Sequence, residues 1–189
     1  MLTNFKSTNK KQTPVSNLTL IALLTAITCI LAPFSIFIPF SPVPISLTNL
    51  VLYISVYILT FKQTTYSYTV YLLLGLVGLP VFSGFSGGFG KLFGPTGGYL
   101  FGFFPLIWIS SYFICHYKTK KHLHFIGMIL GTIICYLFGT LWLSYQLSIS
   151  FLEALAIGVT PYIIGDFMKI LFAIYIGPKI VSRLPHTQN

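Results

Sequence analysis

Long apolar segments separated by short connections run through most of this chain, and they constrain its fold more than any other feature. Only 7% of the 189 residues are charged, against roughly 25% in a typical soluble domain. The chain therefore has too few charges to cover a surface that faces water. Segments of about 20 apolar residues can cross the hydrocarbon core of a bilayer as helices. The sequence predicts an all-α integral membrane protein.

The apolar segments predict six membrane-spanning helices. We place them at about residues 18–38, 47–61, 66–79, 97–116, 125–144 and 161–181. Residues 15–182 then form one six-helix membrane domain, between a disordered cytoplasmic tail, 1–14, and a short cytoplasmic tail, 183–189. A glycine-rich, non-helical segment joins the third and fourth spans. Ser150 and Glu153 have the spacing of a capping box, which predicts a short helix before the sixth span.

The basic residues cluster in alternate connections of the predicted bundle. They lie before the first span, after the second, after the fourth and at the end of the sixth: Lys6, Lys10, Lys11, Lys62, Lys118, Lys120, Lys121, Lys179 and Arg183. The intervening connections carry only Lys91. An excess of Lys and Arg marks cytoplasmic loops, so we expect a multi-pass protein of the cell membrane, surrounded by lipid, with both termini in the cytoplasm. The net charge of +9 reflects this topology, and we expect no nucleic-acid partner.

The chain contains only two carboxylates, Glu153 and Asp166. Helix capping accounts for Glu153. Asp166 lies five residues into the sixth span, and Lys169 follows three residues later on the same helix face. Charges inside a span are costly and usually face a cavity or a partner, so the pair is either a self-neutralising ion pair or a binding site. We favour a site for a ligand that both donates and accepts hydrogen bonds, such as an amide, a urea or a zwitterion.

No group of residues predicts catalysis or metal binding. The only deep carboxylate already stands beside Lys169, which leaves no Ser-His-Asp set, and the cysteines and histidines lack metal-ligand spacing. The run "SGFSGGFGKLFGPTGGYLFG", residues 83–102, has Phe85 and Leu92 where a phosphate-binding loop requires Gly and Ser or Thr. We therefore expect neither an enzyme nor a bound cofactor.

Two connections on the predicted outer side are unusual. The glycine-rich run allows close approach of the backbone, and its aromatic residues would give a pocket apolar walls: Phe85, Phe89, Phe93 and Tyr99. Residues 38–46 contain three prolines that forbid a helix. This loop either folds back over a cavity or forms a rigid connector.

Two small residues, Ala22 and Ala26, lie four apart on the first span. Small residues at this spacing let a second helix approach closely within a membrane. That helix belongs either to the same chain or to a separate subunit.

Three sequence blocks, in order and spacing, resemble the biotin-specific S components (the BioY family) of energy-coupling-factor (ECF) transporters. The blocks are "FSPVPISLTNLVLY", "LLLGLVGLPVFSGFSGGFGKLFGPTGGYLFGF" and "TPYIIGDFMK", and the resemblance covers about residues 18–181. It implies a six-helix subunit that captures biotin at its outer face and delivers it inwards, while separate ATPase subunits use the ATP. The alternatives are an S component for thiamine or riboflavin and, from another class, an integral-membrane enzyme acting on lipid.

The resemblance also implies which residues bind the substrate. Asp166 and Lys169 correspond to the residues that hold the biotin head group. The chain departs from the usual family residues just before Asn49, which leaves Asn49 as the polar contact from the start of the second span. Tyr99 and Ser83 complete the expected substrate-binding set.

Further roles follow from the same resemblance. The proline-rich loop covers the site as a lid, formed here by Pro42, Val43 and Pro44. Ala22 and Ala26 correspond to the residues that contact the transmembrane coupling subunit. Lys91 either guides the anionic tail of biotin inwards or anchors its loop at the lipid headgroups.

Overall fold

The computed structural model describes residues 14–184, and six long helices dominate this range. They are α1 (Pro14–Leu31), α2 (Thr48–Ile58), α3 (Phe61–Leu76), α5 (Gly97–His116), α6 (Lys121–Leu147) and α8 (Ile163–Arg183). Short elements connect them: β1 (Ser35–Ile36), β2 (Ile45–Ser46), α4 (Phe89–Leu92), α7 (Phe151–Gly158) and the 3₁₀ turn η1 (Thr160–Tyr162). Of the two predicted tails, residues 1–13 and 185–189 lie outside the described residues.

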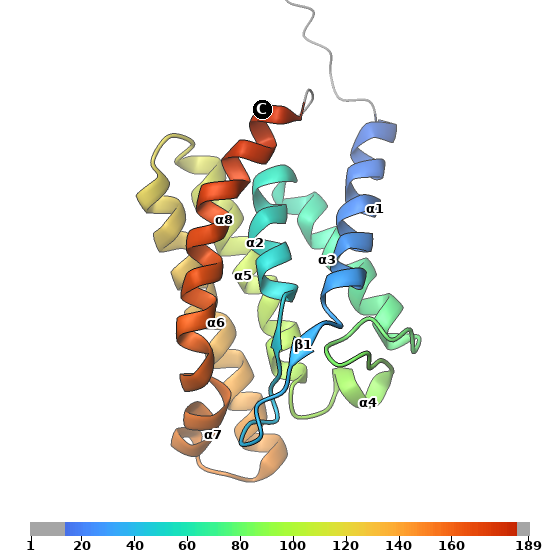
Figure 1. Ribbon diagram of the computed structural model, residues 1–189, viewed down its shortest axis with the longest axis vertical. Coiled ribbons are helices and arrows are strands. Elements are labelled where there is room, and N and C mark those ends of the chain that lie inside the picture. Colours follow the sequence, from blue (N-terminus) through green and yellow to red (C-terminus); the bar gives the residue numbers. More distant parts are fainter. Residues whose placement is uncertain (1–13, 185–189) are drawn as a thin grey trace, which may run out of the picture.

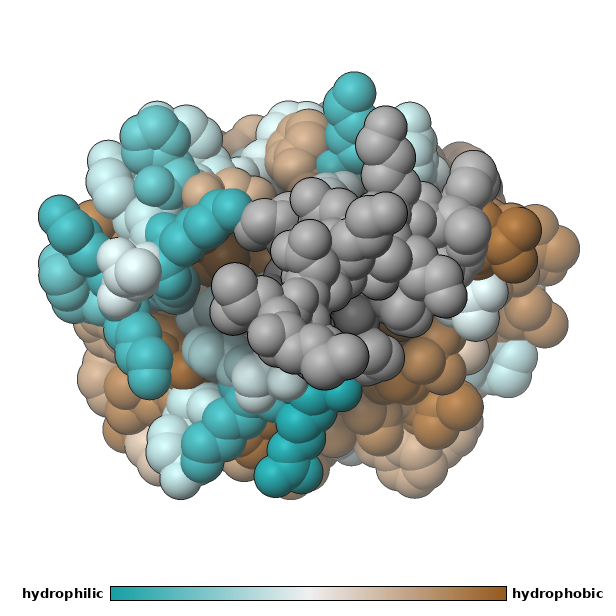
Figure 2. All heavy atoms as spheres, turned by 90° about the horizontal axis from the view of Figure 1, so that it is seen from above, coloured by the Kyte–Doolittle hydropathy of each residue, from teal (hydrophilic) through white to brown (hydrophobic). Residues whose placement is uncertain are grey.

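The two ends of the helix bundle differ in character. The start of α1, the α2–α3 and α5–α6 connections and the end of α8 lie at one end, and the β1–β2 hairpin, α4 and α7 lie at the other (Figure 1). Figure 2 looks onto the first end and shows hydrophilic side chains spread around it. The basic connections are therefore at one end, and the two unusual connections are at the other.

Among residues 14–184, three stretches are long and apolar enough to cross a membrane: Gly97–His116, Lys121–Leu147 and Phe151–Arg183. The apolar parts of α1 and α2, Asn17–Leu31 and Thr48–Ile58, are shorter. At 1.5 Å per residue, the 11 residues of α2 extend only about 16 Å. Length and composition thus mark a multi-pass helical membrane protein.

The first predicted span was too long. Helix α1 ends at Leu31, not at residue 38, because Pro33 disfavours helical geometry at the residue before it and cannot donate a backbone hydrogen bond itself. The chain beyond it forms β1, where Ser35 pairs with Ser46 and Ile36 with Ile45 of β2. The loop between these strands folds back toward the bundle as a hairpin.

Other boundaries also differ from the prediction: α2 ends at Ile58 rather than residue 61, and α3 at Leu76 rather than residue 79. Helix α3 begins at Phe61 rather than residue 66, because the backbone N–H of Thr60 donates to Oε1 of Gln63 at 3.0 Å and caps the earlier turn. Helix α6 extends beyond 125–144 at both ends. Helix α8 begins at Ile163 after the 3₁₀ turn η1, so Pro161 opens that turn and not the long helix.

The predicted capping box before the last span is confirmed. The hydroxyl of Ser150 accepts from the backbone N–H of Glu153 at 3.3 Å, and the backbone N–H of Ser150 donates to the Glu153 carboxylate at 2.8 Å. These bonds begin α7, so Glu153 has the structural role that its spacing indicated.

The segment between α3 and α5 was expected to be non-helical. It contains one helical turn, α4. Gly88 begins this turn with a φ of 87°, a conformation open mainly to glycine. The rings of Phe89 and Phe93 stack at 4.1 Å between centroids across the turn. This stacking of two rings stabilises the helical turn α4, which the high glycine content of the segment did not predict.

Helices α5 and α6 pack closely against each other through glycines on α5. A Cβ added to Gly98 would lie 2.2 Å from Cβ of Trp142, and one added to Gly102 would lie 2.9 Å from the carbonyl oxygen of Cys135. Glycine thus lets the two backbones approach, as small residues do in membrane helix pairs. The result is that Tyr99 on α5 and Cys135 on α6 face the same interior space.

Candidate functional site

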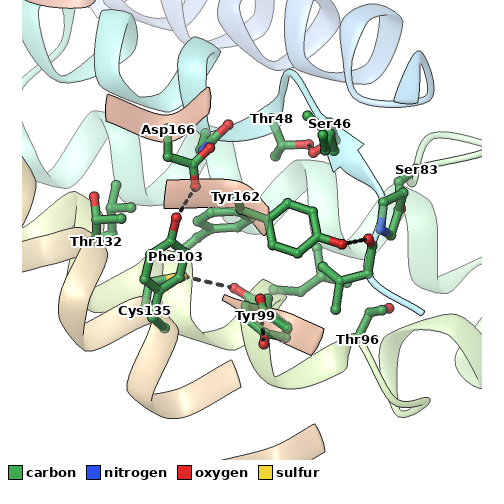
Figure 3. A pocket seen from close by; sticks show the side chains of 18 of the residues that line it. Ser46, Thr48, Ser83, Thr96, Tyr99, Phe103, Thr132, Cys135, Tyr162 and Asp166 are labelled. Carbon is green, nitrogen blue, oxygen red and sulfur yellow. Dashed lines mark hydrogen bonds between the residues drawn. The ribbon is translucent and has the colours of Figure 1, made fainter. Parts of the chain in front are cut away.

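A pocket lies inside the bundle near the hairpin end, and every described helix except α1 contributes to its wall. The five predicted substrate-binding residues all line it: Asn49, Ser83, Tyr99, Asp166 and Lys169. Figure 3 shows three of these side chains around the pocket: Tyr99 from α5, Asp166 from α8, and Ser83 from the glycine-rich segment. The tertiary fold therefore brings together residues that are as far apart as α2 and α8 in the sequence.

Asp166 is the centre of a buried polar cluster. Its Oδ1 accepts from Nδ2 of Asn49 at 2.7 Å and from Nζ of Lys169 at 3.0 Å, and its Oδ2 accepts from the Tyr136 hydroxyl at 2.6 Å. An ionised carboxylate has about four acceptor positions. Oδ2 can thus accept a further hydrogen bond from a ligand N–H group.

Lys169 ties this cluster to the hairpin. Its ammonium group donates to the carbonyl oxygen of Ser46 at 2.7 Å, to Oδ1 of Asn49 at 3.0 Å and to Asp166. The side chains of Lys169 and Asp166 are only 13% and 12% exposed. Buried charges are stable when they are paired and hydrogen-bonded, and Asn49 satisfies both members of this pair. The cluster offers hydrogen-bond donors and an acceptor side by side.

Part of the loop before β2 lies against the pocket, in agreement with the alternative in which residues 38–46 fold back over a cavity. Val43 and Pro44 line the cavity, while Pro42 is exposed and is not part of the wall. The Tyr162 hydroxyl donates to the carbonyl oxygen of Val43 and lies 2.6 Å from Oγ of Ser41 (Figure 3). One tyrosine of η1 thus holds the lid against the bundle.

The apolar wall comes from α5, which includes the predicted Tyr99, and not from the three phenylalanines before it. Leu100, Phe103 and Leu106 line the pocket together with Tyr99. The three phenylalanines expected there are exposed instead: Phe85 by 61%, Phe89 by 65% and Phe93 by 38%. Gly84 and Gly88 have positive φ angles, which turn the backbone of this segment. The sequence does not predict which way the phenylalanine side chains then point.

The wall formed by the glycine-rich segment is polar. Ser83, Lys91 and Thr96 line it. Lys91 is half-buried, and among residues 14–184 its side-chain ammonium group forms no hydrogen bond or ion pair. Burial lowers the pKa of its ammonium group below the ordinary value. An unpaired cation facing a pocket attracts an anionic group.

Several residues that line the pocket were missed by sequence reasoning, and two of them, Tyr136 and Tyr162, make its central hydrogen bonds. Tyr136 belongs to a polar stripe on α6, where Thr132, Tyr136 and Thr140 follow one another at intervals of four residues. This spacing puts them on one helix face and could have indicated that the face points inward. No such pattern surrounds Tyr162, because its role depends on the contact that its hydroxyl makes with Val43 of the hairpin.

Comparisons with known proteins agree with this geometry. A profile of the BioY family matches residues 5–186. The biotin transporter BioY2 of Lactococcus lactis subsp. cremoris is 34% identical over 179 residues, which cover 95% of this chain and 97% of that protein. A probable biotin transporter BioY of Pyrococcus horikoshii is 33% identical, with 85% and 93% of the two chains covered.

A solved structure also matches the fold. The S component for biotin from an ECF-type ABC transporter superposes with a TM-score of 0.83 at 30% identity, over 97% of this chain and 96% of that one. The relatives are transporters with an S-component fold, and not enzymes. With a family profile that matches almost the whole sequence, the chain belongs to the BioY family.

Proposed function

We propose that this chain is the biotin-binding S component of an ECF uptake system. The observation that carries the proposal is the buried cluster of Asn49, Tyr136, Asp166 and Lys169 inside a lidded pocket. The ureido ring of biotin has two N–H donors and one carbonyl acceptor. The Asp166 carboxylate would accept from an N–H group, and Lys169 or Asn49 would donate to the carbonyl oxygen. The named biotin specificity of the relatives supports the same substrate.

The rest of the pocket suits the rest of biotin. Leu100, Phe103 and Leu106 provide apolar contacts for the thioether ring and the aliphatic chain. Lys91 faces the pocket from the glycine-rich side without an ion pair in the described residues. We assign it to the carboxylate of biotin, whose negative charge would complement the positive charge of the lysine.

For the topology, we propose six membrane spans over residues 15–182, with both termini in the cytoplasm. The spans would be α1, α2, α3, α5, α6 and α8, and the two tails would extend from them into the cytoplasm. The support is the position of the basic connections at the end opposite the pocket (Figure 1), as the positive-inside rule requires. The lid and the pocket mouth would then face outward.

For the partners, we propose that α1 contacts the transmembrane coupling subunit through Ala22 and Ala26. Both residues are exposed on α1, next to the exposed Leu23 and away from the contacts that α1 makes with α3 through Thr25. Small exposed residues allow close helix packing. Biotin would be the only ligand of this chain, with no cofactor, and ATP would be used by the ATPase subunits of the complex.

Calorimetric titration of the purified protein in lipid nanodiscs tests the proposal. Biotin should bind at micromolar protein or below, and thiamine and riboflavin, the alternative vitamins, should give no heat. A preference for either of those vitamins, or no binding of biotin, would contradict the assignment. Adding the coupling and ATPase subunits should then convert binding into ATP-dependent uptake.

A further inference from the structure

The hydroxyl of Tyr71 is a buried polar group without a hydrogen bond among the described residues. Tyr71 is 1% exposed, lies on α3 and lines the pocket. Its ring packs edge-on against Phe82 at 5.5 Å between centroids. Its hydroxyl lies beside Thr48 without the geometry of a hydrogen bond to it. The ring is thus held firmly, while its one polar atom is left without a partner.

The other tyrosines of the pocket are different. Four more tyrosines line it, and each hydroxyl has a protein partner: Tyr53 with Thr132, Tyr99 with the Gly158 carbonyl, Tyr136 with Asp166, and Tyr162 with the lid. Nearly all buried polar groups in proteins are hydrogen-bonded, and an exception calls for an explanation such as a ligand. Within this pocket Tyr71 is the exception.

The position of Tyr71 separates it from the Asp166 cluster. Tyr71 comes from α3 and Asp166 from α8, and these two helices lie on opposite sides of α2 (Figure 1). Phe82, against which Tyr71 packs, immediately precedes Ser83 of the glycine-rich wall. A ligand held at Asp166 by one end would meet Tyr71 with its remaining part.

We propose that Tyr71 is a further substrate-binding residue, whose hydroxyl donates a hydrogen bond to the ligand from the α3 side of the pocket. The assignment rests on the proposed function: with the ureido ring of biotin at Asp166, the acceptor is the thioether sulfur or the carboxylated tail. The bound ligand would then supply the hydrogen-bond acceptor that the Tyr71 hydroxyl lacks among the described residues. The pocket would then recognise both ends of the substrate by hydrogen bonds.

The substitution Tyr71→Phe removes only this hydroxyl and tests the proposal. One hydrogen bond to a neutral acceptor contributes a factor of about 2 to 12 in affinity, and one to a charged acceptor contributes more. We expect biotin to bind Tyr71→Phe at least about threefold more weakly in calorimetry. We expect no fall in the melting temperature of the ligand-free protein, because no protein hydrogen bond is lost.

Tyr68→Phe is the matched control on the same helix. The hydroxyl of Tyr68 donates to the Leu100 carbonyl at 2.7 Å, and this residue is not part of the pocket wall. The control should lower the melting temperature and leave biotin affinity unchanged. We thus expect Tyr71→Phe to lower biotin affinity without lowering the melting temperature, and Tyr68→Phe to do the reverse.

Two outcomes would overturn the assignment of Tyr71. One is affinity within a factor of about 1.5 of wild type for Tyr71→Phe; the other is weakened binding that Tyr68→Phe reproduces to the same extent. Both would leave the proposed function intact, since wild type would still bind biotin. Failure of wild type to bind biotin would instead remove the proposed function itself.

Discussion

The side-chain amide of Asn49 donates a hydrogen bond of 2.7 Å to the Asp166 carboxylate, and the two residues are 117 positions apart in the sequence. The same Asn49 side chain accepts from Lys169 through its Oδ1 atom. One amide therefore satisfies both members of a buried ion pair. This bridge joins the start of α2 to α8 and orients the groups that we assign to biotin.

Replacing Asn49 by leucine should weaken biotin binding by about tenfold or more. Leucine has a similar size but removes both hydrogen bonds, each to a charged group and each contributing about 1.5–3 kcal/mol. Titration calorimetry measures the loss. Asn17→Leu on α1, away from the pocket, is the matched control and should bind as wild type does. Equal affinities for both variants would show that Asn49 does not position the cluster.

Asp166→Asn should weaken biotin binding by about 10- to 150-fold, because a charged acceptor is lost and the Lys169 ammonium is left buried without its counter-ion. Equilibrium binding with labelled biotin is the measurement. Glu153→Gln changes the only other carboxylate, which caps α7 at an exposed position, and it should leave the affinity unchanged. Wild-type affinity in Asp166→Asn would be incompatible with the proposed site.

Tyr162→Phe should speed the release of biotin. The substitution removes the hydroxyl that holds the lid at Val43 and Ser41 without altering the ring. Because the lid must open before the ligand leaves, we expect the dissociation rate to rise about 3- to 10-fold, as for the loss of one hydrogen bond. The association rate should change much less.

Stopped-flow displacement of biotin separates these two rates. Tyr175→Phe on α8, the helix that follows η1, is a suitable control, since Tyr175 is 65% exposed and lies far from the lid in sequence. An unchanged dissociation rate in Tyr162→Phe would mean that the tyrosine does not retain the lid.

Lys91→Gln should slow the association of biotin at low ionic strength and have little effect at high salt, because screening removes electrostatic attraction. Since burial lowers the pKa of Lys91, the attraction should also fade, as the pH rises, at a lower pH than for a solvated lysine. Lys62→Gln on the opposite end is the control. A salt-independent rate difference, or none, would favour an anchoring role at the headgroups.

The double substitution of Ala22 and Ala26 by leucine should abolish uptake and preserve binding. The larger side chains would hold a neighbouring helix away from the exposed face of α1, while the pocket receives no side chain from α1. Uptake of labelled biotin is compared in cells that co-express the coupling and ATPase subunits. Ala156→Leu, at an exposed position on α7, controls for added bulk, and uptake at the wild-type rate in the double variant would argue against this contact surface.

Much of the architecture could be predicted from the sequence because hydropathy, proline and charge act locally. The span predicted at about residues 97–116 coincides with α5, and the capping box predicted from Ser150 and Glu153 begins α7. Asp166 and Lys169 could be identified as candidate site residues because charges inside an apolar span are costly and usually face a cavity or a partner. The first span is shorter than predicted because Pro33 ends the helix.

The contacts of the site could not be read in the same way. Tyr136 and Tyr162 are two tyrosines among twelve, and their roles arise only where α6 and the hairpin meet α8. The phenylalanines of the glycine-rich run were assigned to the pocket wall but point outward, because glycines with positive φ redirect the backbone.

The sequence by itself determined that this chain folds in a membrane, roughly where its helices lie and which two charges are buried, because each of these depends on the chemistry of neighbouring residues. The tertiary structure alone decided which side chains complete the site. Hydrogen bonds such as those from Asn49 to Asp166 and from Tyr162 to Val43 join residues more than 100 positions apart. Helix packing and the fold of the hairpin set these pairings, and no local pattern specifies them.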